Sequence, residues 1–150
     1  MKIAIGSDHG GYIHKAKIIE YLRKNIHEVV DFGCNSTESC DYPPIAKEVA
    51  LNVSGGKLEK GILICGTGVG MAIAANKIKG IRAACCWSDA VAMLIAQHNM
   101  ANIICLPGRY ATSDQIIRWI DIWLSTPYST EERHKKRVAE ISEIENEFCK

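Results

Sequence analysis

Five short runs of residues divide the chain at intervals. Four are strongly apolar, at residues 2–6, 61–65, 81–86 and 102–108, and a fifth, more polar run lies at 27–33. A strand buried inside a parallel sheet meets helices on both sides, so its sequence is apolar on both faces, as in the first of these runs. The pattern therefore predicts five strands.

Helical spacing fills the intervals between the runs. Apolar positions recur at this spacing after the first run (Ile18, Ile19, Leu22 and Ile26) and after the prolines at 43–44 (Ile45, Val49 and Val53). Proline is favoured in the first turn of a helix, where its missing N–H group leaves no hydrogen bond unmade. We expect one helix after the first strand and another that begins at the prolines.

Capping signals mark the remaining helices. Gly80 is expected to end a helix over 69–79, and Ser88 to cap a helix that runs through about His98. Two further stretches match the capping box, Thr112 with Gln115 and Ser129 with Glu132. The apolar positions expected to point inward after the first box are Ile116, Ile120, Trp123 and Leu124.

Strands and helices alternate through all 150 residues without an internal repeat or a linker. Such alternation is typical of a doubly wound parallel sheet covered by helices on both faces. A chain of this length is in the usual size range of one domain and can bury about 70% of its unfolded surface. We expect a single α/β domain over residues 1–150.

The composition is that of an ordinary globular protein, with 47% hydrophobic residues, 23% charged residues and a formal net charge of +1. This balance gives no general attraction to nucleic acid or to a membrane surface. The apolar start of the chain breaks at Gly6 and Ser7, too early for an export signal or a membrane span. We therefore expect a cytoplasmic protein.

The seven cysteines predict neither a disulfide framework nor a metal site. Their number is odd and several lie in apolar runs, at Cys85, Cys86 and Cys105, so most are expected to be reduced core residues. The chain has no CxxC pair and no closely spaced pair of histidines, which argues against a structural zinc site.

Chemically active side chains follow the predicted strands. In an open parallel sheet, ligands bind beyond the carboxyl ends of the strands. The residues at those ends are Ser7, Asp8 and His9, then Cys34 and Asp41-Tyr42, then residues 65–70, and finally Gly108-Arg109. A carboxylate, an imidazole, a thiol and a guanidinium are therefore expected at one edge of the sheet.

The sequence CGTGVG at residues 65–70 joins a buried strand directly to a helix. Its glycines let backbone N–H groups turn toward an anion, and the start of the helix favours the thiolate of Cys65, which could act as a base. Cys65 could equally be another inert core cysteine. A dinucleotide-binding fingerprint fits less well, because these glycines follow the third strand and no acidic residue stands near position 85.

Further candidates lie elsewhere in the chain. His98 and Asn99 end the fourth helix, where a lone histidine is more often an ordinary cation than a catalyst. Arg133 and Arg137 are one helical turn apart and share a stripe with Ile141, Ile144 and Phe148. With Arg109 they supply three planar guanidinium groups, which suit phosphate well. An anionic ligand explains them better than a solvated basic surface does.

Five motifs spread over nearly the whole chain carry a resemblance to a known family: GSDHGG (6–11), ESCDYP (38–43), ICGTGVGMAIAANKIKGIRAA (64–84), QHNMAN (97–102) and RHKKRV (133–138). In them the chain resembles the type B ribose-5-phosphate isomerase family, which includes allose-6-phosphate and galactose-6-phosphate isomerases. The resemblance implies a three-layer α/β/α, Rossmann-like fold with a five-stranded parallel sheet. It also implies a C-terminal helix that packs on a neighbouring subunit.

The resemblance further implies a reaction. Ribose 5-phosphate and ribulose 5-phosphate would be interconverted through an enediolate, with Cys65 as the base, Thr67 assisting at the sugar oxygens, and no metal or cofactor. Backbone groups of the glycine loop would stabilise the developing oxyanion, at Gly66, Gly68, Val69 and Gly70.

The resemblance assigns the remaining residues to substrate binding and ring opening. Asp8 and His98 would orient hydroxyls and open the ring, Asn99 would hold the open chain, and Tyr42 would line the sugar pocket. The residues that would hold the phosphate are His9, Arg109, Arg133 and Arg137. The pocket would be a composite of two subunits in a homodimer or tetramer, so that a lone subunit would be inactive.

The sequence departs from the family pattern beside two sets of binding residues. Met100 stands where an aspartate usually follows the His-Asn pair, and Glu131-Glu132 stand where glycines usually precede the arginine. One branch of the family uses a glutamate base shortly after the glycine loop, but Gly70-Met71-Ala72 contains no carboxylate, so the cysteine branch fits better. Two alternatives stay open, an isomerase of a six-carbon phosphosugar and a non-catalytic phosphosugar-sensing module.

Overall fold

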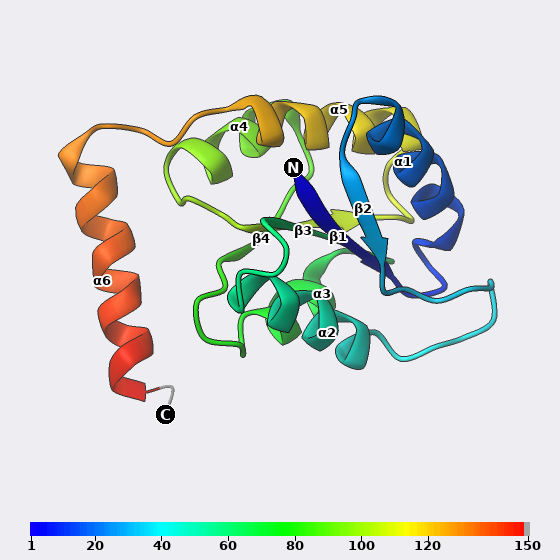
Figure 1. The fold of residues 1–150 in the computed structure, drawn as a ribbon, viewed down its shortest axis with the longest axis horizontal. Coiled ribbons are helices and arrows are strands. Elements are labelled where there is room, and N and C mark those ends of the chain that lie inside the picture. Colours follow the sequence, from blue (N-terminus) through cyan, green and yellow to red (C-terminus); the bar gives the residue numbers. More distant parts are fainter. Residues whose placement is uncertain (149–150) are drawn as a thin grey trace.

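A five-stranded parallel sheet forms the centre of the molecule in a computed structural model that describes residues 1–148 (Figure 1). The strands are β1 (Lys2–Ser7), β2 (Glu28–Asp31), β3 (Lys60–Cys65), β4 (Ala83–Cys85) and β5 (Ile103–Pro107). Their order is β2-β1-β3-β5-β4, and every neighbouring pair is parallel. The winding reverses between β1 and β3, the kind of point where open α/β sheets bind ligands.

Helices cover both faces of the sheet. On one face lie α1 (Tyr12–Lys24), α4 (Asp89–Gln97) and α5 (Ser113–Ser125), and on the other lie α2 (Tyr42–Ser54) and α3 (Val69–Ala75) (Figure 1). The predicted three-layer α/β/α fold with five parallel strands is confirmed. None of the helices within residues 1–148 is long and apolar enough to cross a membrane.

Helix α6 (Glu132–Phe148) belongs to neither layer. Figure 1 shows it standing apart from the other helices, at the side of the sheet where β4 lies. Its contact with the rest of the chain includes a hydrogen bond of 2.7 Å from the N–H of Gly80 to the carboxylate of Glu145. Much of α6 is therefore exposed in the single chain.

The sheet separates two apolar cores. One lies under α1, α4 and α5 and includes Ile5, Ile64 and Trp123. The other lies under α2 and α3 and includes Leu63 and Cys65. Side chains alternate between the two faces of a strand, so adjacent residues of β3 enter different cores. The apolar composition of the strands on both faces follows from this arrangement.

Several predicted capping signals are confirmed. The hydroxyl of Ser88 accepts the N–H of Val91 at the start of α4, and Thr112 with Gln115 forms a complete capping box at the start of α5. The prolines at 43–44 occupy the first turn of α2. Local sequence thus fixes where these three helices begin.

The structure corrects the predicted ends of two helices. Ile26 lies beyond α1 in a left-handed turn (φ 63°) and is 91% exposed, so it does not share the buried stripe of that helix. The helix expected over 69–79 ends at Ala75. The side chain of the next residue, Asn76, bonds to both the N–H and the C=O of Ala83 and so ties the helix end to β4.

The predicted capping box at Ser129 and Glu132 does not form. The hydroxyl of Ser129 accepts the N–H of Glu131, only two residues on, and α6 begins at Glu132. The carboxylate of Glu132 instead pairs with Lys135 at 2.8 Å. The competing ion pair and the short local hydrogen bond explain the difference.

Replacing Thr112 with alanine should lower the free energy of unfolding by about 1 kcal/mol, because it leaves the Gln115 N–H at the start of α5 without its partner. The loss would be measured by urea unfolding. Thr130→Ala is the control, since Thr130 is exposed and lies outside the helices. Equal losses in the two variants would contradict the role of the cap.

Candidate active site

Three turns meet at the carboxyl edge of the sheet, following β1, β3 and β5. The N–H of Gly108 donates to the carbonyl of Cys65 at 2.8 Å, and the N–H of Arg109 donates to the carbonyl of Gly66 at 3.1 Å. A Cβ atom added to Gly108 would lie 2.5 Å from the carbonyl oxygen of Gly10, so only glycine permits this approach. The predicted gathering of side chains from separate strands at one edge is confirmed.

Cys65 ends β3 with its side chain in the core beneath α2 and α3, and it is 5% exposed. The N–H of Gly68 donates to its sulfur at 3.1 Å. Gly68 has a left-handed conformation (φ 79°), which turns this N–H back toward the strand and is costly for other residues. This bond holds the sulfur at the junction between β3 and the glycine loop.

The other free thiols of the described residues are Cys85, Cys86 and Cys105. Burial raises the pKa of Cys85, raises that of Cys86 to about 11, and raises that of Cys105 well above its ordinary value. These thiols stay protonated at neutral pH. The expectation that they are reduced cysteines of the apolar interior is confirmed, and Cys149 lies outside the described residues.

Asp8 and His9 follow β1 and approach the glycine loop. Asp8 is 7% exposed, and its carboxylate accepts the N–H of Gly10 at 2.8 Å. His9 is half-buried, and its Nδ1 accepts the N–H of Cys40 at 3.3 Å. These bonds fix both side chains in the turn that follows β1, at the carboxyl edge of the sheet.

Tyr42 and Arg109 flank the same loop. A Cβ atom added to Gly70 would lie 2.7 Å from the ring of Tyr42, and one added to Gly66 would lie 3.3 Å from Cδ of Arg109. The aromatic ring and the guanidinium chain therefore rest directly on glycines of the loop. A side chain at either glycine would therefore displace the ring of Tyr42 or the chain of Arg109.

Two backbone donors of the glycine loop have partners within the loop itself. The Gly68 N–H bonds to the sulfur of Cys65, and the Val69 N–H bonds to the hydroxyl of Thr67 at 3.2 Å. Thr67 is exposed. The loop is thus preorganised around the thiol, with the threonine at its outer surface.

Four predicted site residues lie away from this edge. His98 caps the carboxyl end of α4, and Asn99 lines a groove with Arg82 and Ala101, which precede β4 and β5. They therefore lie at the amino edge of the sheet. A five-residue strand such as β5 is about 16 Å long, so this edge is about that far from the carboxyl edge, where Cys65 lies. Arg133 and Arg137 are on α6.

The ring of His98 stacks on the ring of His134 in the first turn of α6, with 3.9 Å between centroids. Burial lowers the pKa of His134, and the neighbouring charges of His98, Arg133 and Arg137 lower it further. The second group of predicted residues is therefore a cluster of its own. Sequence reasoning missed His134, which the motif RHKKRV contains but whose burial no spacing indicated.

The change from the family pattern at Glu131 has a visible effect. Its carboxylate accepts a hydrogen bond from Nε of Arg133 at 2.7 Å. One of the arginines predicted to bind phosphate is therefore paired with a neighbouring carboxylate. Met100, the other departure, adopts a left-handed conformation (φ 51°) and is exposed, so it forms the turn between α4 and β5.

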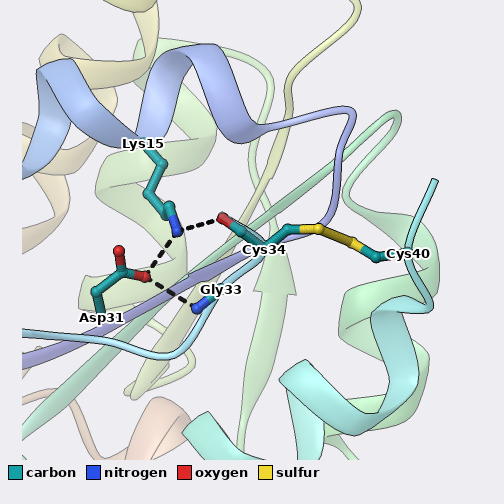
Figure 2. Close-up of polar contacts among 5 residues, drawn as sticks. All are labelled: Lys15, Asp31, Gly33, Cys34 and Cys40. Atoms are coloured by element: carbon teal, nitrogen blue, oxygen red, sulfur yellow. Dashed lines mark hydrogen bonds and ion pairs between the residues drawn. A yellow bond between two sulfur atoms is a disulfide. The ribbon is translucent and has the colours of Figure 1, made fainter. Parts of the chain in front are cut away.

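A disulfide joins Cys34 and Cys40 beside His9 (Figure 2). Buried Lys15 donates to Asp31 at 2.8 Å and to the carbonyl of Cys34 at 2.7 Å. These bonds fasten the segment between β2 and α2 at its start. The sequence analysis predicted mostly reduced cysteines and missed this pair, which only the folded loop brings together.

Comparisons with known proteins point to one family. The sequence model of the family described as Ribose/Galactose Isomerase matches residues 3–141. Ribose-5-phosphate isomerase B of Escherichia coli (strain K12) is 45% identical over 144 residues, which cover 96% of each chain.

Solved structures agree with that match. Ribose-5-phosphate isomerase B of Clostridium thermocellum superposes with a TM-score of 0.95 at 46% identity, over 99% of each chain. The enzyme of Mycoplasma genitalium, solved with bound ribulose-5-phosphate, superposes with a TM-score of 0.93 at 40% identity, over 97% of each chain.

Among residues 1–148, no three His, Cys, Asp or Glu side chains gather so that they could hold a metal ion.

Reducing the Cys34–Cys40 disulfide should lower the free energy of unfolding by about 2 kcal/mol, because the link closes a short loop and restricts the unfolded chain. Urea unfolding with and without dithiothreitol measures the loss. The double variant Cys34→Ser/Cys40→Ser should show the same loss and no response to dithiothreitol. A wild-type protein equally stable in both conditions would contradict the prediction.

Proposed function

Because the chain belongs to the Ribose/Galactose Isomerase family, we propose that it interconverts ribose 5-phosphate and ribulose 5-phosphate with Cys65 as the base. Curated relatives named ribose-5-phosphate isomerase B, at 36 to 45% identity, support the reaction. The observation that carries the role of Cys65 is its position, since its sulfur accepts a backbone N–H at the point where three loops meet. We propose that residues 1–150 form a single phosphosugar isomerase domain.

The proposed reaction moves one proton within the open-chain sugar. The Cys65 thiolate takes the proton from C2, the electrons form an enediolate, and the thiol returns the proton to C1, while a proton moves from the oxygen on C2 to the oxygen on C1. No electrons enter or leave, so the chemistry requires no redox cofactor. Thr67 and the N–H groups of the glycine loop would stabilise the charge on the enediolate oxygens, with the Val69 N–H exchanging the Thr67 hydroxyl for a substrate oxygen.

Asp8 and Tyr42 would complete the sugar pocket on this edge. The Asp8 carboxylate is held by the N–H of Gly10 and would orient a sugar hydroxyl. The ring of Tyr42 packs on the glycine loop and would form one wall of the pocket. His9 and Arg109 would bind the phosphate from the same side.

The remaining residues would come from a second subunit. His98, Asn99, Arg133 and Arg137 form a separate cluster near α6, at the other edge of the sheet from Cys65. The apolar stripe of α6 is exposed in the single chain, at Ile141 (45%), Ile144 (60%) and Phe148 (72%). We propose that this stripe docks on a neighbouring subunit in a homodimer or larger assembly and brings the cluster over the neighbour's Cys65.

A six-carbon phosphosugar is the second candidate substrate, because the matching family also covers galactose isomerases. It would use the same base and glycine loop. Comparing kcat/KM for ribose 5-phosphate and allose 6-phosphate separates the two. A clear preference for allose 6-phosphate would overturn the five-carbon assignment.

Replacing Cys65 with alanine should lower turnover of ribose 5-phosphate by about a hundredfold to ten-thousandfold, the usual contribution of a general base. The wild-type protein should retain its turnover in excess EDTA, since the proton transfer is assigned to a thiol. Cys105→Ala is a matched control, because that thiol lies in the same core but its raised pKa keeps it protonated.

Near-wild-type turnover of Cys65→Ala would remove the residue from its role. Loss of wild-type turnover in EDTA would contradict the metal-free reaction. No turnover in the wild type with either sugar phosphate would favour the sensing module.

Mixing two inactive variants tests the composite pocket. Cys65→Ala and His98→Ala, unfolded together and refolded, should regain about a quarter of wild-type activity, because half of the randomly paired dimers then contain one intact pocket out of two.

Cys65→Ala mixed with Asp8→Asn is the control. Both substitutions lie on the same edge, so no pairing restores a pocket. Absence of recovery in the first mixture, with dimers formed, would contradict a shared site.

A further inference from the structure

His14 joins three elements behind the candidate site. It lies in the first turn of α1, with Nε2 2.7 Å from the carbonyl oxygen of Gly108 and Nδ1 2.8 Å from the hydroxyl of Ser113. The ring is half-buried, and Ser113 is 8% exposed. One imidazole therefore spans α1, the turn after β5 and the start of α5.

The directions of these hydrogen bonds follow from their partners. A carbonyl oxygen can only accept, so Nε2 of His14 carries a hydrogen and donates it to Gly108. In the neutral imidazole Nδ1 then accepts, and the hydroxyl of Ser113 donates to it. The Gly108 carbonyl thus sets the tautomer of His14, and the hydroxyl of Ser113 satisfies the other ring nitrogen.

The Gly108 carbonyl belongs to the same planar peptide unit as the N–H of Arg109. That N–H donates to the carbonyl of Gly66 at 3.1 Å, while His14 binds the oxygen at the other side of the unit. Both polar groups of the peptide are therefore fixed. The orientation of this plane sets the direction in which the Arg109 side chain leaves the backbone, over Gly66.

We propose that His14 is a positioning residue for substrate phosphate, acting through the peptide between Gly108 and Arg109. The inference rests on the proposed function to the extent that Arg109 binds the phosphate group. His14 itself lies behind the turn and does not touch the substrate. Without the His14 hydrogen bond, the Gly108 carbonyl would be free to rotate. The guanidinium of Arg109 could then turn away from the direction in which it meets the phosphate.

Three substitutions separate positioning from packing. In His14→Gln, the amide NH₂ group reaches about as far as Nε2 and can keep the bond to Gly108. In His14→Asn, the shorter amide reaches only the level of Nδ1 and keeps at most the contact with Ser113. His14→Leu fills the space and keeps neither bond.

We expect His14→Asn and His14→Leu to raise KM for ribose 5-phosphate about tenfold, the effect of roughly one hydrogen bond, with a much smaller change in kcat. The inhibition constant of inorganic phosphate should rise by a similar factor. His14→Gln should restore both values to near those of the wild type. Urea unfolding of each variant reports the effect on packing separately.

Two outcomes would overturn the inference. One is an unchanged KM and phosphate inhibition constant in His14→Asn, even with lowered stability, since the residue would then serve packing alone. The other is a His14→Gln variant that binds phosphate as weakly as His14→Asn. If His14→Leu does not fold, the comparison of glutamine with asparagine still decides.

The proposed function is tested separately by wild-type turnover. If the wild type turns over neither sugar phosphate, calorimetric titration with inorganic phosphate replaces kinetics. The order of affinities among the variants is expected to be the same, and equal affinities would overturn the role of His14.

Discussion

The candidate site depends on the close approach of three glycine turns at the reversal point of the sheet. Gly10, Gly66 and Gly108 come from turns after three different strands, and a Cβ atom added to Gly10 or Gly108 would meet main-chain atoms of the neighbouring turns. Because these two approaches and the hydrogen bonds from Gly108 and Arg109 join main-chain atoms, they bring neighbouring side chains to one place with little freedom. Asp8, Cys65 and Arg109 are each within two residues of such a contact.

The same constraint explains how a buried cysteine can be chemically useful. Cys65 belongs to an apolar core, and burial raises the pKa of three other thiols in the molecule. It differs from them in having the Gly68 N–H directed at its sulfur. A single backbone donor, aimed by a left-handed glycine, distinguishes the proposed base from ordinary core cysteines.

Much of the fold and of the carboxyl-edge site was predictable from sequence, because both follow from local pattern and from the geometry of parallel sheets. The five strands, the caps at Ser88 and Thr112 and the residues of the carboxyl edge are all of this kind. The Cys34–Cys40 bond and the contacts of His14 were not, since they join residues whose proximity depends on how loops fold or on partners 94 and 99 positions away. The separation of His98 from Cys65 also required the fold, because motif spacing does not tell which edge a helix end reaches.

Under the proposed assembly, helix α6 would make activity depend on the concentration of the protein. The helix stands outside both layers with an exposed apolar stripe, which the proposed subunit contact would cover. Under the proposed assembly, the number of working pockets per chain would fall on dilution as the law of mass action requires. Activity per chain would then rise with the concentration of the protein. A cell that makes few copies of the chain would obtain less turnover from each of them.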